Sequence, residues 1–221
     1  YMIISMGGLG IGQMMISTGA ENSMALFILA SVLVSIAVVP VLLSATGAPN
    51  FEEPERMSVR RLLQVSPLAV IGLGLNGVAV SMLFGMGAVY GLSIGLDSSE
   101  VGYFMTAPVF GALILQYPVG RLSDRFDRRM VIMGVAVVGG IAAGLATLFG
   151  KGDFALLLVC MLIYGGSLFP LYSLCIAHAN DFLTPRQMVA AASGLVMVNG
   201  GGAVLGSPLA ALSIEFLGIG S

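Results

Sequence analysis

Charged side chains gather in one short stretch of this sequence, residues 120–129. It reads Gly-Arg-Leu-Ser-Asp-Arg-Phe-Asp-Arg-Arg and places four arginines and two aspartates in ten residues. The carboxylate of Asp124 could accept hydrogen bonds from the N–H groups of a helix N-terminus, where the helix dipole is positive. Residues 184–187 are predicted to begin such a helix and to add a guanidinium, so the two stretches could form an ionic contact. The candidate residues of the charged stretch are Gly120, Arg121, Asp124, Arg125, Arg128 and Arg129, and the predicted partners of Asp124 are Thr184, Arg186 and Gln187.

Catalytic chemistry has little support elsewhere in the sequence. Intramembrane hydrolysis needs two facing aspartates, a serine–histidine pair or an HExxH zinc site. His178 is the only histidine and no acidic residue lies in the middle of an apolar run, so we expect no enzyme, no metal and no other cofactor. His178 could sense protons, although a histidine that merely meets water at the membrane interface is commoner. Cys160 and Cys175 share one apolar run and are expected to serve in packing.

Uncharged polar side chains within the apolar runs have two possible roles. They could face a central cavity and contact a substrate, or they could hydrogen-bond to a neighbouring helix. The sequence leaves both roles open. These candidates are Gln13, Asn76, Gln116, Tyr164, Tyr172 and Asn199.

The candidate residues must be positioned by membrane-spanning helices, as the composition indicates. Apolar residues make up 57% of the 221 residues and charged residues only 9%, and the mean hydropathy is +1.02. Such a chain could not bury its apolar surface in water. Seven uncharged runs are each long enough to cross a hydrocarbon core of about 30 Å. They are residues 1–20, 22–51, 62–96, 101–120, 130–150, 154–180 and 187–214. We therefore predict an all-α integral membrane protein with about seven spans.

Basic residues fix a predicted orientation, because an excess of Lys and Arg marks cytoplasmic loops. If the spans alternate, eight of the nine basic residues fall on one face, and only Lys151 falls on the other. The eight are Arg56, Arg60, Arg61, Arg121, Arg125, Arg128, Arg129 and Arg186. This places residues 47–64 and the Asp124 loop in the cytoplasm.

Several helix starts are also indicated by the sequence. Asp97 followed by Glu100 resembles a capping box at the start of the run 101–120, and Asp153 is placed to cap the helix of the run 154–180. Ser66 and Thr184 each put a capping hydroxyl before a proline at the first helical position. These residues are expected to begin four of the spans.

The charged stretch resembles the loop motif of the major facilitator superfamily, G-x-L-[AS]-D-R-x-G-R-[RK], at every position but one. Asp127 replaces the usual glycine, and we expect aspartate to tolerate the left-handed backbone of that turn. Three segments are similar to one branch, the YcaD-like bacterial transporters. They are Gln116-Tyr117-Pro118-Val119-Gly120-Arg121-Leu122-Ser123-Asp124, Phe169-Pro170-Leu171-Tyr172-Ser173 and His178-Ala179-Asn180-Asp181.

This resemblance implies a partial superfamily fold. Residues 1–46 would be helices five and six, residues 47–64 a cytoplasmic linker, and residues 65–221 helices seven to eleven, ending before or within helix twelve. The sequence would then be a fragment that begins and ends inside the transmembrane domain. Helices five and eight meet across the two halves of this superfamily, so Gln13 is expected to lie near Gln116.

The resemblance also implies a function. It indicates a secondary transporter of an unidentified small molecule, working by alternating access in the bacterial inner membrane, with the charged loop latching the cytoplasmic gate. The direction of transport and coupling to protons are left open. We expect a monomer whose partners are the lipid bilayer and the substrate, and a net charge of −2 argues against nucleic acid. The alternative is a polytopic receptor or intramembrane enzyme.

Overall fold

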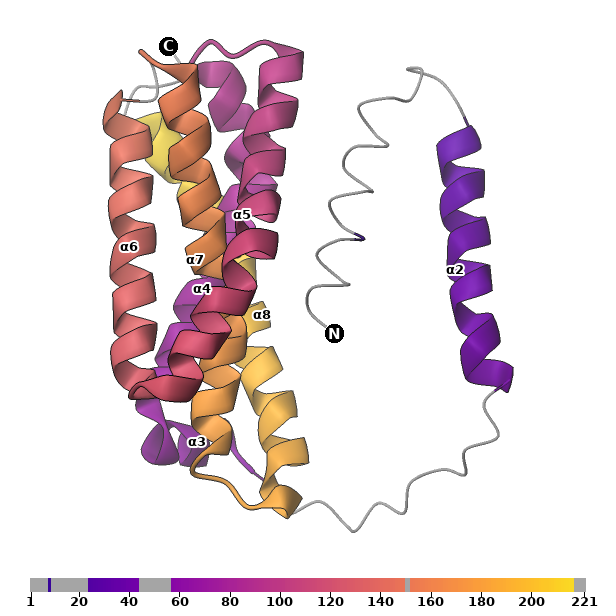
Figure 1. Ribbon diagram of the computed structural model, residues 1–221, viewed down its shortest axis with the longest axis vertical. Helices are drawn as coiled ribbons and strands as arrows, with labels where there is room; N and C mark the ends of the chain where they lie inside the picture. Colours follow the sequence, from indigo (N-terminus) through magenta and orange to yellow (C-terminus); the bar gives the residue numbers. More distant parts are fainter. Residues whose placement is uncertain (1–7, 9–23, 44–56, 150–151, 217–221) are drawn as a thin grey trace.

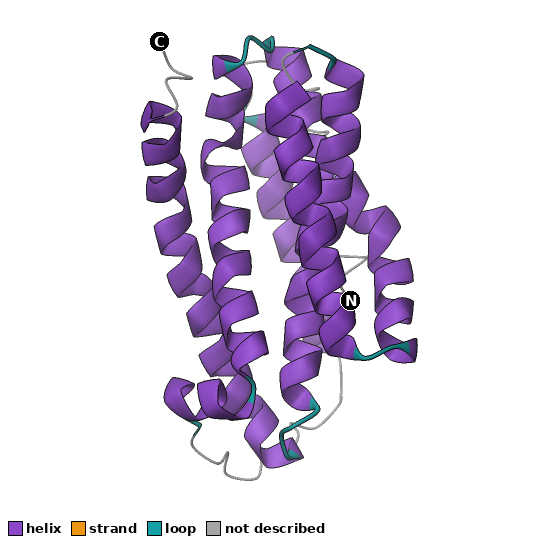
Figure 2. Cartoon of the chain, turned by 90° about the vertical axis from the view of Figure 1, so that its left-hand side faces the viewer, coloured by secondary structure: helices purple, strands orange, loops and turns teal. Residues whose placement is uncertain are grey.

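The computed structural model describes residues 8, 24–43, 57–149 and 152–216, and these contain helices and loops but no strand (Figure 2). Five helices are long and apolar enough to cross a membrane, whereas α2 contributes a shorter apolar stretch, Ile28–Pro40. The all-helical membrane fold is thereby confirmed. Apart from residue 8, the first predicted span lies outside the described residues, so the count of seven remains a prediction. The helices are α2 (Ala25–Leu43), α3 (Val59–Val65), α4 (Pro67–Ser93), α5 (Ser98–Arg125), α6 (Arg128–Phe149), α7 (Phe154–Asn180) and α8 (Pro185–Phe216).

Helices α4 to α8 form a bundle whose members run alternately in opposite directions (Figure 1). Short α3 and the α5–α6 and α7–α8 connections lie at its lower end, and the α4–α5 turn lies at its upper end. One apolar cluster joins Leu62, Val131 and Leu183 near the lower end, and a second joins Leu83, Phe104 and Leu157. The described arginines of the sequence therefore share one end of the bundle, as the predicted alternation requires. Helix α2 stands apart from the bundle.

Two of the predicted helix starts use their acidic caps. The Asp97 carboxylate accepts from the Ser99 and Glu100 backbone N–H groups at 2.8 Å, and Glu100 accepts from the Asp97 N–H at 3.0 Å. The N–H of Glu100 and the Ser99 hydroxyl lower the pKa of the Asp97 carboxyl, since both favour its charged form. Asp153 caps α7 through the N–H groups of Ala155 and Leu156.

The Ser66 start differs from the prediction in detail, whereas α8 begins directly after Thr184 as predicted. Ser66 is the residue before α4 and Pro67 is at its first position, but the Ser66 hydroxyl makes no capping hydrogen bond. Its φ of −144° and ψ of 76° depart from the usual cap geometry, so the hydroxyl cannot reach the first turn. Helix α8 begins at Pro185, and the Gln187 side chain returns to accept from the Thr184 N–H at 3.3 Å.

Glycines bring pairs of spans into backbone contact. A Cβ atom at Gly77 of α4 would overlap the Asn199 carbonyl of α8, and one at Gly202 of α8 would overlap the Gly74 carbonyl of α4. The same holds for α5 and α7, where a Cβ at Gly165 would overlap the backbone of Pro108. Missing side chains allow this close approach within the membrane. Most of the α8 glycines thus serve packing inside the bundle, while a Cβ at Gly200 or Gly201 would meet no atom within 4 Å among the described residues.

Candidate functional site

The charged hairpin is shorter than a flexible loop, because only Phe126 and Asp127 separate α5 from α6. The Asp127 carboxylate accepts from the Arg129 N–H at 2.8 Å, and its carbonyl accepts from the Val131 N–H at 3.1 Å. These contacts make Asp127 the cap of α6. No described residue other than glycine has a positive φ, so the expected left-handed backbone at Asp127 was wrong. A capping carboxylate explains how aspartate can stand here, because a helix cap with a negative φ needs no glycine.

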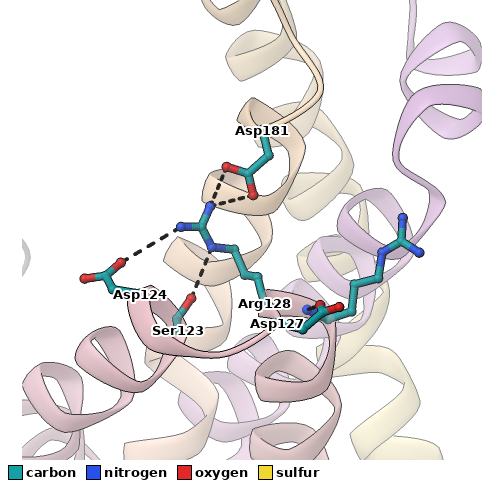
Figure 3. A network of polar contacts seen from close by, with 6 residues as sticks. Ser123, Asp124, Asp127, Arg128 and Asp181 are labelled. Atoms are coloured by element: carbon teal, nitrogen blue, oxygen red, sulfur yellow. Dashed lines mark hydrogen bonds and ion pairs between the residues drawn. The ribbon is translucent and has the colours of Figure 1, made fainter.

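Arg128 is the centre of the site and joins three segments (Figure 3). Its Nη1 donates to both carboxylate oxygens of Asp181 at 2.7 Å, and its Nε donates to the Ser123 hydroxyl at 3.1 Å. Its Nη2 lies 4.0 Å from an oxygen of Asp124. The Arg128 side chain is 23% exposed, so its contacts are partly shielded from water. The α5–α6 hairpin is therefore tied to the start of the α7–α8 connection.

The contact of Arg128 with Asp124 is weaker than its contact with Asp181. Its side chain is 77% exposed, compared with 49% for Asp181, and its partner in the described chain is Arg128. No hydrogen bond joins Asp124 to residues 184–187 in the described part of the chain. From the sequence, no role was assigned to Asp181. Its signals were its place in the segment 178–181 that resembles the transporter branch and its position directly after a span on the arginine-rich side.

The second hairpin arginine contacts an aromatic side chain. The Arg129 guanidinium lies 5.8 Å from the centre of the Phe182 ring, within reach of a cation–π interaction. The His178 ring meets Phe182 edge-on, with centroids 5.2 Å apart. His178 is 4% exposed, so the expectation of an imidazole that merely meets water does not fit this packing. Arg128 and Arg129 thus both hold the residues that follow α7.

The remaining hairpin residues face outward. Arg121 donates to the Tyr117 hydroxyl at 3.2 Å on the same helix, and Arg125 is exposed. A Cβ at Gly120 would meet no neighbour among the described residues. Arg186 is exposed in the first turn of α8.

Three of the polar candidates within the spans contact other helices. The Asn76 amide donates to the Leu168 carbonyl of α7 at 2.7 Å. The Asn199 side-chain amide donates to the Leu73 carbonyl at 3.0 Å and to the side-chain oxygen Oδ1 of Asn76 at 3.4 Å. Gln116 of α5 donates to the Ser173 hydroxyl of α7 at 3.3 Å.

The other candidates are placed less definitely. Tyr164 and Tyr172 are half-buried beside the two apolar clusters. Gln13 lies outside the described residues, so its predicted neighbour remains a prediction. No group of three or more metal-binding side chains occurs in the described part of the chain.

The site can therefore act as an ionic clasp. One guanidinium is shared by carboxylates from two segments, Asp181 after α7 and Asp124 in α5. Charge-assisted hydrogen bonds are short and about twice as strong as neutral ones, so the contact stabilises the arrangement in which the α5–α6 hairpin lies against Asp181.

Comparisons with known proteins point to one family. The family model described as Major Facilitator Superfamily matches residues 69–221. The protein called "Uncharacterized MFS-type transporter YcaD" from Escherichia fergusonii is 25% identical over 220 residues, covering 97% of this chain and 56% of the relative. An uncharacterized MFS-type transporter from Enterobacter sp. (strain 638) is 26% identical over 217 residues, with the same coverage. The chain thus spans about half the length of these relatives, and no solved structure matches it.

Proposed function

Because the chain belongs to the major facilitator superfamily, we propose that it forms part of a secondary transporter that moves a small molecule by alternating access. The observation that carries this proposal is the Arg128 clasp, which links the superfamily's loop motif to the segment after α7. A loop that served only as a topology signal would need arginines but no such geometry. The relatives named as MFS-type transporters support transport but name no substrate.

The bundle is proposed to be most of one transporter half. Residues 65–221 would supply helices seven to eleven, residues 47–64 the linker between halves, and residues 1–46 helices five and six. The alternating chain direction of helices α4 to α8 supports this assignment. We propose a monomer in the bacterial inner membrane, and we leave open whether protons drive it, because the spans described carry no acidic residue at mid-depth.

The arginine-rich end is proposed to face the cytoplasm. Single cysteines at positions 125 and 186 are expected to react with a membrane-impermeant maleimide in inside-out vesicles and to stay unlabelled in intact cells. The reason is that both positions are exposed at the arginine-rich end of the bundle. A cysteine at position 99, beside Asp97 at the other end, serves as the control and should label in intact cells. Labelling of position 125 or 186 in intact cells would overturn this orientation.

Asp124 is proposed to dock on the N-terminus of α8 in the outward-open state. Helix-terminus contacts contribute about 0.3–1 kcal/mol when exposed and up to about 2 kcal/mol when partly buried. Asp124→Asn is therefore expected to leave folding intact, because the side chain's contact within the described chain is the 4.0 Å approach to Arg128. It should shift the full-length protein toward the inward-open state and slow transport.

Arg186→Ala should act in the same direction but more weakly, because the backbone amides remain. Cytoplasmic accessibility and transport rate are the two measurements. Wild-type values of both in Asp124→Asn would reduce the loop to a topology signal.

The alternative functions are a polytopic receptor or an intramembrane enzyme. Neither has a specific observation in its favour among the described residues. Growth of a deletion strain on a panel of metabolites and toxic compounds would separate them from a transporter and would narrow the substrate class.

A further inference from the structure

Helix α6 has an outward face that no other described helix covers. It packs along α7 and touches α5, and it forms one edge of the bundle (Figure 1). A Cβ atom at Gly134, Gly140 or Gly144 would meet no atom within 4 Å among the described residues. The exposed large side chains of this face are all apolar, namely Met130, Met133, Val137, Val138, Ile141, Leu145 and Leu148.

The one hydroxyl of α6 is satisfied inside the helix. Thr147 is the only serine or threonine in α6, and its Oγ1 donates to the Gly144 carbonyl at 2.8 Å. A helix face that satisfies its polar groups internally can lie against hydrocarbon without losing hydrogen bonds. The acyl chains of lipids are therefore a suitable neighbour for the length of this face.

Arg129 stands at the arginine-rich end of the same face. Met133 follows it by about one helical turn, so the guanidinium and the apolar side chains belong to one side of α6. The guanidinium lies 5.8 Å from the centre of the Phe182 ring, which is itself 47% exposed. This cation–π contact uses the charge of the guanidinium and not its five N–H donors, which can still bind an acceptor.

The described carboxylates at this end of the bundle are engaged elsewhere. Asp181 and Asp124 form ion pairs with Arg128, and Asp127 accepts from the backbone N–H of Arg129 and not from its side chain. Seven arginines stand against these three aspartates in the described part of this end, so its net charge is positive and attracts anions. The arginines are Arg60, Arg61, Arg121, Arg125, Arg128, Arg129 and Arg186.

We propose that Arg129 and the outward face of α6 form a binding site for an anionic phospholipid. The phosphate binds the Arg129 guanidinium, whose paired N–H donors match phosphate oxygens, and an acyl chain lies along Met133, Val137 and Ile141. The Phe182 ring restrains the guanidinium, so less side-chain freedom is lost when the headgroup binds. A free phosphate ion would use the guanidinium alone, whereas a lipid also contacts the apolar face. This binding goes beyond the proposed transport function and does not depend on it.

Native mass spectrometry of the full-length protein in detergent micelles tests this inference. Phosphatidylglycerol is titrated as the anionic probe, and phosphatidylcholine with the same acyl chains as the zwitterionic probe. Arg129→Ala is expected to weaken phosphatidylglycerol binding about fivefold, because one arginine near the membrane surface contributes about 1 kcal/mol to the attraction of anionic lipids. Phosphatidylcholine binding should not change. Arg129→Lys keeps the charge and should keep most of the phosphatidylglycerol affinity.

Arg125→Ala is the matched control. It removes the same charge from an exposed position of the same hairpin, but this arginine ends α5 and does not belong to the α6 face. Its phosphatidylglycerol affinity should stay close to the wild-type value, and a large excess of inorganic phosphate at constant ionic strength should not displace the lipid.

Equal phosphatidylglycerol affinity in the wild type and in Arg129→Ala would overturn the inference. Equal losses in Arg129→Ala and Arg125→Ala would also overturn it, because they would indicate a general attraction to the basic end and no specific site. Displacement of the lipid by inorganic phosphate would show that the guanidinium binds free anions and that the apolar face takes no part.

Discussion

Replacing Gly165 with alanine adds a single methyl group, yet we expect it to lower the free energy of unfolding of the bundle strongly. The added Cβ would overlap the carbonyl and Cα of Pro108, which are backbone atoms of α5 and cannot rotate away. The two helices would have to separate, and their contact around Gly111 and Gly166 would loosen with them. Overpacking of this kind costs about 1–3 kcal/mol, and backbone overlap belongs at the upper end. Thermal unfolding of the full-length protein in detergent measures the effect.

Gly140→Ala provides the matched control. It makes the same change in α6, but a Cβ at this position would meet no atom within 4 Å among the described residues. Alanine is favoured over glycine in a helix by about 1 kcal/mol. This variant should therefore match or exceed the wild-type melting temperature. Equal losses in both variants would show that backbone contact at the α5–α7 crossing is not what makes Gly165 necessary.

Reversing the charge of Arg128 is expected to have the largest effect on function. In Arg128→Asp, the new carboxylate would face Asp181 and Asp124 in place of their shared guanidinium. The variant loses the charge-assisted contact between Arg128 Nη1 and both Asp181 oxygens, and it gains like-charge repulsion. Hydrogen bonds to charged groups contribute about 1.5–3 kcal/mol, and the half-exposed Asp181 reduces this to about 1–2 kcal/mol. The equilibrium between two transporter states should then change by about 5- to 30-fold.

Asp181→Arg added to Arg128→Asp should restore much of this loss, because the exchanged pair can form the same contact in reverse. Cytoplasmic accessibility of a cysteine at position 126, where Phe126 is 63% exposed, measures the recovery in the single and double variants. The Asp124→Arg combination is the control and should recover less, since the Asp124 carboxylate lies at 4.0 Å and is mostly exposed. Equal recovery by both would show that net charge matters and the specific pair does not.

The fold could largely be predicted from the sequence because a membrane leaves few choices. A chain with long uncharged runs must form helices that satisfy their own backbone, so the positions of α4 to α8 follow from the runs and from caps such as Asp97 and Asp153. The sequence could not show which glycines meet which helix. Gly165 and Gly200 look alike in the sequence, yet Gly165 lies against Pro108, whereas Gly200 has no such neighbour in the described part of the chain.

The candidate site was predicted in part. The loop motif identified Arg128 and its hairpin, but Asp181 lies 53 residues away and falls outside that motif. Its role depends on α6 and α7 packing so that the end of one helix meets the start of the other. At Asp127 the family pattern was misleading. Because the family has glycine at this position, a left-handed backbone was expected, but Asp127 caps α6 without a positive φ.

Transport by the full-length protein in proteoliposomes tests the central claim most directly, using a compound identified by the deletion-strain screen. The clasp account predicts saturable uptake or counterflow in wild type, a loss of at least about fivefold in Arg128→Asp, in line with the expected 1–2 kcal/mol, and substantial recovery when Asp181→Arg is added. Flux in the wild type no greater than in protein-free liposomes, or equal flux in Arg128→Asp and wild type, would contradict the account.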